Sequence, residues 1–560
     1  MSLVPEPARP GVAAWHRSAW AGEGARWADA LGLESRALTA AYWAGVGLVV
    51  AGFFVTRLLP CVDYPQHLAL SDIARRLQDG GAVEQAEYQL NYFTYNGLFH
   101  LMVAALSRVV PIELAGRAVI AASLLATSAA VVVLLKRLRR PTAHAALFTP
   151  ILFSFSLGWG FVNYVLATAI ALWALVFVAR AALEPTVVDL AAIAALGLAC
   201  AFAHVLAMII LCVAAASIAI EQAWRRAPGS PVARLRATLL RSVVVLAPLL
   251  LGCAYCIAVY QRQYAWNPDV YRDPTLEGTA PPLWQKVVYF TAFATDLFGD
   301  HSDQVILWAT VAVILGCAVT DFASRPTDVS GRPPALVPFA VLTFAYFATP
   351  MVLIGTHLIF PRLAQWALLG AILAMPRLAG VSATRWRACM AALGLAAGAN
   401  ALVHCLLYDR ETRDASATID DLPQGRAATA VILEPWTDSF RNGTLTHLAA
   451  YYAARKHGSW AFSFARYLSV PVRFKPGATP AWPAHGWEFS GEDYDARCKY
   501  ARAFPLVIAR APSDWPVDGA AEATVRKTIF KEDADRVRLL SHHGQYWAFD
   551  TAGLPDDGAL

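Results

Sequence analysis

The segment Leu38–Leu58 reads LTAAYWAGVGLVVAGFFVTRL, and it runs directly into the loop sequence LPCVDYPQH at Leu59–His67. An apolar run of about 20 residues is long enough to cross the hydrocarbon core of a bilayer as a helix. The loop then presents a carboxylate, Asp63, and an imidazole, His67, where this span ends. This juxtaposition predicts a membrane-spanning protein with polar chemistry at the mouth of a helical bundle.

The composition of the whole chain supports a membrane protein. Of its 560 residues, 57% are hydrophobic and only 16% are charged, and the mean hydropathy is +0.44. A chain of this composition does not close into a soluble globule. The formal net charge of +5 comes from arginines that lie in short clusters between apolar runs. Such clusters indicate membrane topology rather than a nucleic-acid-binding face.

Further apolar runs predict about ten or eleven transmembrane helices in all. They lie at roughly 96–110, 113–135, 143–157, 160–182, 187–220, 241–260, 303–321, 335–355, 358–377 and 384–408. The runs at 96–110 and 143–157 are short, and each is interpreted either as a full span or as a re-entrant piece. The predicted fold is an α-helical polytopic membrane protein of a bacterial inner membrane.

Basic loops predict the orientation of the helices, because cytoplasmic loops carry an excess of Lys and Arg. Starting from a cytoplasmic N-terminus, the basic segments Arg225–Arg241, Arg325–Arg332 and Arg377–Arg387 fall inside. The strongly basic segment Lys136–Arg140 disagrees with this order unless one of the short runs fails to cross. Asp63, Asp300 and the region after Tyr408 are expected outside.

A change of character near residue 409 divides the chain. Residues 1–37 are predicted to be a cytoplasmic tail, and 38–408 a transmembrane domain whose outer loop, 59–95, carries the site. From 409 to 560 the sequence is polar, with short β-type runs around a helical stretch near Leu445–Arg455. These runs predict a soluble periplasmic α/β domain. Cys61 and Cys498 would both face this oxidising side, so a bridge between them is possible.

The first outer loop has two interpretations. After it, Leu70, Ile73 and Leu77 share one face of an amphipathic run that ends near Gly80, which predicts a helix lying along the membrane surface. Asp63 before Pro65 can simply be the N-cap of this helix. Alternatively, Asp63 is a functional carboxylate, with His67 on the same face if the helix begins early enough to include both.

A second candidate segment surrounds Arg362. Pro361 suits the first turn of a helix, which would place Arg362 in that turn at the outer face. A cation there opposes both the helix dipole and the positive-inside bias, and an anion such as a phosphate would relieve both conflicts. His357 lies nearby as a second phosphate contact. The alternative is an arginine that extends to lipid headgroups.

A third candidate is a group of acidic residues in the outer loop before the apolar run at 303–321. These residues suit a divalent cation, although they can equally be helix caps. It consists of Asp296, Asp300, His301 and Asp303. Within apolar stretches, the polar residues His100, Asn163 and His204 are interpreted as interhelical hydrogen-bonding groups. The segment Gly158–Tyr164 predicts a break between two helices that lines a cavity.

Taken together, these features resemble the GT-C superfamily of polytopic membrane glycosyltransferases. The resemblance rests on Asp63 within DYPQH, on GFVNY at Gly160–Tyr164, and on Arg362 after an outer loop. It covers the architecture of the whole chain and points to an uncharacterised bacterial branch. Many members have a second acid beside the first, whereas Tyr64 stands here.

The resemblance implies transfer of a sugar from a polyprenyl-phosphate donor to a glycan, lipid or protein acceptor at the extracytoplasmic face, with inversion. Asp63 would be the general base, and His67, His357 and Arg362 would bind substrate. No cofactor is certain, and a divalent cation is possible. Partners would be the lipid-linked sugar, the acceptor and membrane lipid, but no nucleic acid.

Two other functions stay open from the sequence. A transporter, or a flippase for a glycolipid, would also place polar residues between helices, but its site would lie near the membrane midplane. A non-catalytic assembly or sensor protein would need neither Asp63 nor Arg362. The clustering of unusual charges at one face favours an enzyme.

Overall fold

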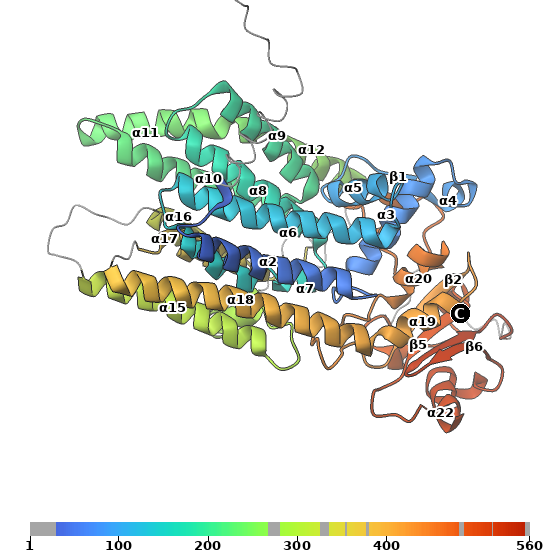
Figure 1. Cartoon of the computed structure of the whole chain (residues 1–560). Coiled ribbons are helices and arrows are strands. Elements are labelled where there is room, and N and C mark those ends of the chain that lie inside the picture. The colour runs from blue at the N-terminus through green and yellow to red at the C-terminus, as the bar shows by residue number, and fades with distance from the viewer. Residues whose placement is uncertain are drawn as a thin grey trace, which may run out of the picture.

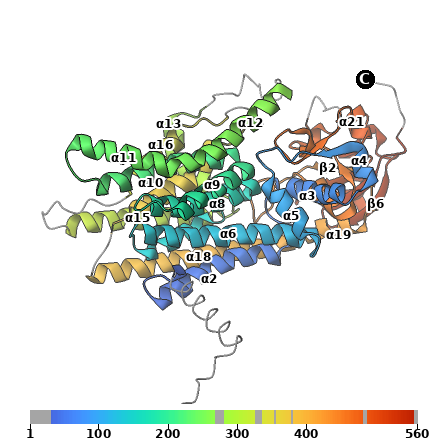
Figure 2. The same ribbon diagram turned by 90° about the horizontal axis from the view of Figure 1, so that it is seen from above.

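The computed structural model describes residues 30–266, 280–324, 335–352, 356–376, 380–480, 486–517 and 519–554. They form an elongated helical bundle with a strand-containing C-terminal region at one end (Figure 1, Figure 2). Seven helical segments are long and apolar enough to span a bilayer, and four apolar segments are shorter. The predicted fold class, a polytopic helical protein with a C-terminal α/β region, is therefore confirmed.

The long segments pack side by side along the bundle axis. They are α2 (Arg36–Val55), α6 (Ile112–Arg137), α8 (Val162–Ala181), α10 (Val205–Arg226), α11 (Pro231–Leu246) continuing through η2 (Ala247–Leu249) into α12 (Leu250–Trp266), α15 (Ser302–Ser324) and α18 (Gly380–Glu411). Shorter elements complete the bundle. They are η1 (Thr142–Ile151), α7 (Phe155–Gly158), α9 (Val187–Ala203), α13 (Leu283–Val288), α14 (Phe290–Ala294), α16 (Leu336–Ala348), η3 (Phe360–Leu363) and α17 (Ala364–Ala374).

Two predicted segments differ from the observed helices. The run at 96–110 forms only α5 (Leu98–Leu106), whose nine residues extend for about 14 Å, too short for a span. The run at 187–220 was predicted as one segment, but it is two helices separated at His204, whose φ of −168° is extended. Apolar composition continues through this break, so hydropathy alone does not reveal it.

The absence of a span at α5 resolves the conflict over the basic segment Lys136–Arg140. Without α5, α2 and α6 run in opposite directions, so this segment returns to the end where α2 begins. The backbone N–H of Ala143 donates to Glu34, just before α2, at 2.8 Å. Lys136–Arg140 therefore lies at the end remote from the C-terminal region. The basic loop Arg325–Arg332 and most of the tail 1–37 lie outside the described residues.

Close contact between α2 and α18 depends on small residues. A Cβ on Gly45 would lie 2.6 Å from the carbonyl oxygen of Gly394, and a Cβ on Gly52 would lie 2.9 Å from Cys405 Sγ. Small residues allow helix backbones to approach in this way inside membranes. α18 leads into the C-terminal region, and the first outer loop begins where α2 ends. The pairing of α2 with α18 therefore places both at the same end of the bundle.

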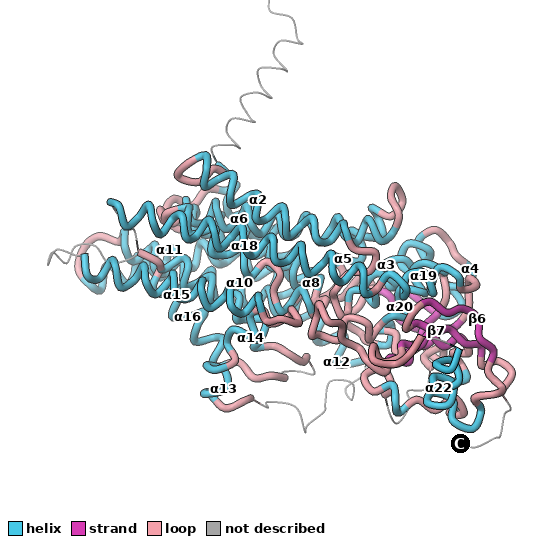
Figure 3. The backbone as a smooth tube through the Cα atoms, turned by 60° about the horizontal axis from the view of Figure 1, so that its bottom comes forward, coloured by secondary structure: helices cyan, strands magenta, loops and turns pink. Residues whose placement is uncertain are grey.

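A five-stranded sheet organises the C-terminal region, in the order β3-β2-β5-β7-β6. The strands are β2 (Ala427–Ile432), β3 (Ser459–Trp460), β5 (Leu506–Arg510), β6 (Arg538–His543) and β7 (Tyr546–Asp550). β2 is parallel to β3 and β5, whereas β7 is antiparallel to β5 and β6. Figure 3 shows the strands confined to one end of the molecule.

Alternate residues of the sheet belong to two different cores. Leu506 and Ile508 of β5 join the large core that continues into the helical bundle. Val507 and Ala509 face a second core that includes Val525 of α22 (Gly519–Phe530). Two further helices, α19 (Arg413–Asp421) and α20 (Leu448–Lys456), pack on the sheet. Burial of both faces fixes the sheet against the bundle.

The first outer loop is interlocked with the C-terminal region. It forms α3 (Tyr64–Gln78), α4 (Ala82–Glu87) and β1 (Tyr88–Leu90), and β1 pairs antiparallel with β4 (Val472–Phe474). The sequence predicted that α3 lies along the membrane surface. Instead, residues from Tyr64 to Ala74 are all buried, because α5 and α20 pack against α3.

Candidate functional site

Asp63 stands at the N-cap position of α3, but its carboxylate makes no capping hydrogen bond. The backbone around it is held by another loop: Val62 N–H donates to Gly158 O at 3.0 Å and Asp63 N–H donates to Trp159 O at 3.1 Å. The carboxylate is therefore available for other contacts while its backbone is fixed.

Gly160 permits this close approach. Its φ is +78°, and a Cβ there would lie 2.5 Å from the backbone nitrogen of Asp63. A positive φ combined with a close backbone contact is a requirement that glycine meets without strain. The predicted helix break is confirmed here, since α7 ends at Gly158 and α8 begins at Val162.

A histidine from the C-terminal region contacts Asp63. His447 Nε2 lies 3.2 Å from Asp63 Oδ1, and His447 Nδ1 lies 2.7 Å from Glu488 Oε1. Burial alone would lower the pKa of His447, but the Glu488 and Asp63 carboxylates outweigh burial and raise this pKa to about 10. His447 is thus an imidazolium between two carboxylates at neutral pH.

Gln66 fixes the other side of the His447 ring. Its Oε1 accepts from Trp460 Nε1 at 2.8 Å and from Phe464 N at 3.2 Å, so its Nε2 must face His447. That Nε2 donates to Phe462 O at 3.1 Å and also lies 3.2 Å from His447 Nδ1. Gln66 Nε2 already donates to Phe462 O, so it does not need His447 Nδ1 as an acceptor. We therefore assign a proton to His447 Nδ1, directed at the nearer Glu488 Oε1. This contact is an ion pair rather than a well-aligned hydrogen bond.

His67 belongs to a separate chain of hydrogen bonds. Its Nδ1 lies 3.0 Å from His100 Nε2, and His100 Nδ1 lies 2.8 Å from the carbonyl oxygen of Asn96. A carbonyl only accepts, so His100 donates through Nδ1 and accepts from His67. Burial, followed by the nearby His100 and His447, holds the pKa of His67 well below its ordinary value. His67 therefore stays neutral, one helical turn from Asp63.

Arg362 is buried, with 6% of its surface exposed, and lies in the first turn of η3 as the sequence predicted. Its guanidinium lies 3.7 Å from the centroid of the Phe161 ring. It approaches His204 Nε2 at 3.2 Å and donates to the backbone oxygen of His357 at 3.1 Å. The exposed His357 imidazole does not make this contact.

The charge of Arg362 has no carboxylate partner in the part of the chain that the structure describes. Its Nε is buried and makes no hydrogen bond among these residues. A buried cation without a counter-ion is costly unless an anion binds beside it. A guanidinium in this state suits phosphate, whose oxygens match its planar array of donors.

One loop joins the surroundings of Asp63 and Arg362. Trp159 binds the backbone of Asp63, Phe161 lies under the guanidinium of Arg362, and Tyr164 donates to the backbone oxygen of Arg362 at 2.8 Å. Asp63 is also near enough to act electrostatically on Arg362. Gly158–Tyr164 thus holds a carboxylate and a guanidinium at the same end of the bundle.

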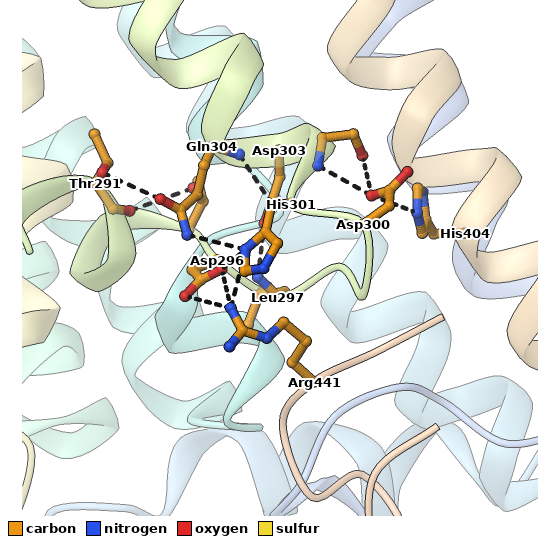
Figure 4. Close-up of polar contacts among 11 residues, drawn as sticks. Thr291, Asp296, Leu297, Asp300, His301, Asp303, Gln304, His404 and Arg441 are labelled. Atoms are coloured by element: carbon orange, nitrogen blue, oxygen red, sulfur yellow. Dashed lines mark hydrogen bonds and ion pairs between the residues drawn. The ribbon is translucent and has the colours of Figure 1, made fainter. Parts of the chain in front are cut away.

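Figure 4 shows the acidic set of the outer loop engaged in local contacts. Asp296 pairs with Arg441 of the C-terminal region at 2.8 Å, and Asp300 lies 3.2 Å from His404. Asp303 accepts from the backbone of Leu297 at 2.6 Å. These contacts fasten the loop to its neighbours. Among the described residues, no cluster of three or more His, Cys, Asp or Glu has a metal-binding arrangement.

A charged cavity of about 1020 Å³ borders α3 without reaching the proposed site. Arg57, Glu113 and Arg455 line it, whereas Asp63, His447 and Arg362 do not. Arg455 pairs with Glu113, and Arg57 pairs with Asp409 at 2.6 Å. We therefore locate the chemistry by its residues rather than by cavity size. Cys61 and Cys498, outside the bundle helices, are free thiols.

Several site residues were not predicted as such. His204 was predicted only as an interhelical hydrogen-bonding group, and the helix break at which it lies was visible only in the structure. His447 was predicted only as part of the helical stretch near Leu445–Arg455. Glu488 and Gln66 carried no sequence signal, because their relevance depends on contacts between distant segments.

Comparison with known proteins gives one structural match. No family model matches the chain, and no curated protein matches. The fold is similar to that of ArnT from Cupriavidus metallidurans, solved with bound undecaprenyl phosphate. The TM-score is 0.47 at 9% identity, over 90% of this chain and 96% of that chain. The roles proposed below rest on the geometry of this chain alone.

Proposed function

We propose that this protein is a membrane glycosyltransferase that moves a sugar from a polyprenyl-phosphate donor to an acceptor hydroxyl at the extracytoplasmic face. The observation that carries the proposal is that one loop supports both Asp63 and Arg362. Arg362 is buried and has no carboxylate partner among the described residues, and the Asp63 carboxylate makes no capping hydrogen bond. A glycosyl phosphate needs these two functions: an anion site for the leaving phosphate and a base for the attacking hydroxyl.

The leaving-group side of the reaction falls to Arg362. The bond between the anomeric carbon and the phosphate oxygen breaks, and the electron pair of that bond leaves with the phosphate. Arg362 stabilises the negative charge that develops there, and its Nε–H supplies a donor that is unused within the described residues. Burial strengthens this interaction because little water competes.

The attacking side falls to Asp63. His447 holds Oδ1 at 3.2 Å, which leaves Oδ2 to accept the proton of the acceptor hydroxyl as its oxygen bonds to the anomeric carbon. Base and leaving group act on opposite faces of one carbon, so a single displacement inverts the sugar. The contact with the His447 imidazolium fixes the orientation of the Asp63 carboxylate.

A lipid-linked donor explains the location of the site. Arg362 begins an apolar helical segment, Phe360–Ala374, and Asp63 follows directly after the span α2. A prenyl chain can remain in the bilayer beside such helices while its phosphate reaches Arg362. A soluble nucleotide-sugar would require no apolar surroundings for its leaving group.

The proposal is tested with purified protein in lipid nanodiscs supplied with radiolabelled prenyl-phosphate sugars. Asp63→Asn is expected to lower sugar transfer by about 10²–10⁴-fold, since a base contributes that much, and to leave donor binding in place. Asp79→Asn, an exposed acid at the other end of α3, is the matched control and should retain activity.

Two results would refute the proposal. Full transfer activity in Asp63→Asn would leave the reaction without its proposed base. In a leaflet assay with vesicles, movement of intact donor lipid without release of sugar would assign a flippase instead.

A further inference from the structure

A second cavity lies in the C-terminal region, apart from Asp63 and Arg362. It has a volume of about 150 Å³, and its walls include Glu411, Asp414, Glu434, Trp436, Arg510 and Tyr546. None of these residues takes part in the reaction proposed above. The volume suits one small ligand rather than a long chain.

The topology of the sheet makes this position a preferred ligand site. The chain leaves β2 and forms β3 on one side of it, then crosses to form β5 on the other side, and all three strands are parallel. The connections therefore diverge between β2 and β5. In open α/β sheets, ligands bind beyond the carboxyl ends of strands at such a switch point. Glu434 follows β2 and Arg510 ends β5, at these carboxyl ends.

Two aromatic side chains give the cavity its character. Trp436 is 52% exposed, although large aromatic residues are usually covered. Tyr546 is only 2% exposed, and its hydroxyl lies near the Arg510 guanidinium but makes no well-aligned hydrogen bond among the described residues. Arg510 Nη1 donates to the backbone oxygens of Glu434 and Trp436. The exposed Trp436 ring and the Tyr546 hydroxyl are therefore both able to contact a bound ligand.

The charges of the cavity select the class of ligand. Four carboxylates, those of Glu411, Asp414, Glu434 and Asp438, line it against the single guanidinium of Arg510. Glu434 already pairs with this guanidinium at 3.2 Å. An excess of carboxylates repels phosphates and nucleotides. Carboxylates instead accept hydrogen bonds from hydroxyl groups, and an indole face packs against the apolar face of a sugar ring.

We infer that this cavity is a carbohydrate-binding subsite that takes one sugar unit, with Trp436 as the stacking platform and Asp414 and Tyr546 as hydrogen-bonding groups. The segment from Leu433 to His447 leads from the cavity to the proposed site, and within it Asn442 donates to Gly158 O at 2.6 Å. A sugar held here is bound by the same region that contributes His447. The subsite stands independently of the reaction assigned to Asp63.

The test uses the full-length protein in detergent or nanodiscs and ligand-observed saturation-transfer NMR. The probes are D-glucose, D-galactose and N-acetyl-D-glucosamine, with calcium chloride in a separate titration. At least one sugar is expected to bind the wild type. Trp436→Ala should weaken that binding at least about tenfold, whereas Trp436→Phe retains an aromatic face and should stay within about threefold. Tyr546→Phe should weaken it by about fivefold.

Control variants separate this subsite from the proposed catalytic site. Asp63→Asn and Asp535→Asn, the latter an exposed acid outside the cavity, should both bind the sugar as the wild type does. Trp436 is half exposed, so its replacement leaves the core intact, and an unchanged thermal midpoint checks this.

Three results would overturn the inference. One is that no probe sugar binds the wild type. Another is that Trp436→Ala binds with wild-type affinity, or that binding disappears in Asp63→Asn but not in Trp436→Ala. The third is calcium binding that depends on Asp414 without any sugar signal, which would make the cavity a cation site.

Discussion

At the scale of single residues, the proposed site consists of two buried charges in contrasting surroundings. His447 lies between two carboxylates, whereas Arg362 is surrounded by an aromatic ring, an imidazole and a carbonyl oxygen. The charge of His447 is neutralised by these carboxylates. The charge of Arg362 has no carboxylate partner among the described residues and suits a bound anion. This contrast is what the proposed function uses: His447 as a positioning group and Arg362 as the phosphate contact.

Arg362→Lys tests the phosphate contact. Lysine keeps one positive charge but loses the planar array of donors, so donor binding should weaken by about 10-fold, and Arg362→Ala should weaken it further. Equilibrium binding of radiolabelled prenyl phosphate measures both variants. Equal binding by the wild type and Arg362→Ala would contradict the role of Arg362.

The pH dependence tests His447. The pKa of this group is raised in the folded protein to about 10, so the stability that its charge contributes is fully present below the unfolded pKa of about 6.5 and is lost as the pH rises through about 10. We expect the thermal midpoint to fall between pH 6.5 and about 10, and activity to fall around pH 10, where the folded protein loses the His447 proton. A variant His447→Asn should lack this alkaline loss of stability.

Glu488→Gln tests whether the Glu488 carboxylate raises the pKa of His447. Loss of one carboxylate lowers the pKa of His447, so the alkaline decline of activity should move to lower pH by about 1–2 units. Glu492→Gln, an exposed acid nearby in the sequence, is the matched control. An identical pH–rate profile in Glu488→Gln and the wild type would show that Glu488 does not set the charge of His447.

At the scale of elements, the loop between α7 and α8 connects the two halves of the site. It binds the backbone of Asp63 at Gly158 and Trp159 and supports Arg362 through Phe161. A displacement of this loop would move the Asp63 carboxylate and the Arg362 guanidinium together. Catalysis is sensitive to such displacements, since small shifts in reacting groups have large effects on rate.

Gly160→Ala tests this loop. Its Cβ would lie 2.5 Å from Asp63 N at a φ of +78°, so both strain and collision are expected. Gly477→Ala is a matched control, since Gly477 has φ +81° with nothing within 4 Å. The backbone strain alone should cost each variant about 1 kcal/mol of stability, and the collision adds to this loss only in Gly160→Ala. Only Gly160→Ala should also lose activity, by about 10²-fold; equal activities in the two variants would contradict the coupling.

At the scale of the whole molecule, the chain separates basic loops from the proposed site. The segment Lys136–Arg140 lies with the start of α2, while Asp63 lies beside the C-terminal region. By the positive-inside rule, the basic end is expected in the cytoplasm. The proposed site and the C-terminal region would then face the extracytoplasmic side, as the proposed function requires.

Cysteine labelling in whole cells tests this orientation. In a variant whose nine native cysteines are replaced, Asp79→Cys at the site end should react with a membrane-impermeant maleimide. Arg385→Cys, exposed on α18 at the opposite end, should react only after permeabilisation. The reverse pattern would place the proposed site in the cytoplasm and contradict the function proposed here.

The sequence by itself determined the features that depend on local composition. Apolar runs predict membrane helices because each backbone group must be satisfied within its own helix, and Gly158–Tyr164 predicts a break because its glycines interrupt such a run. The start of a helix at Arg362 follows from Pro361 in the same way. The sequence left open whether the run at 96–110 spans, and the structure decided that it does not. The split at His204 was not predicted, because hydropathy does not register where an apolar segment turns.

Only the tertiary structure decided which polar groups meet. Asp63 and His447 are 384 positions apart, and Arg362 and His204 are 158 apart. Such contacts depend on how helices pack and on where the C-terminal region docks, and no local pattern encodes them. Glu488 illustrates this limit: in sequence it is one acid among many, and only the imidazole of His447, brought beside it by folding, gives its charge a consequence.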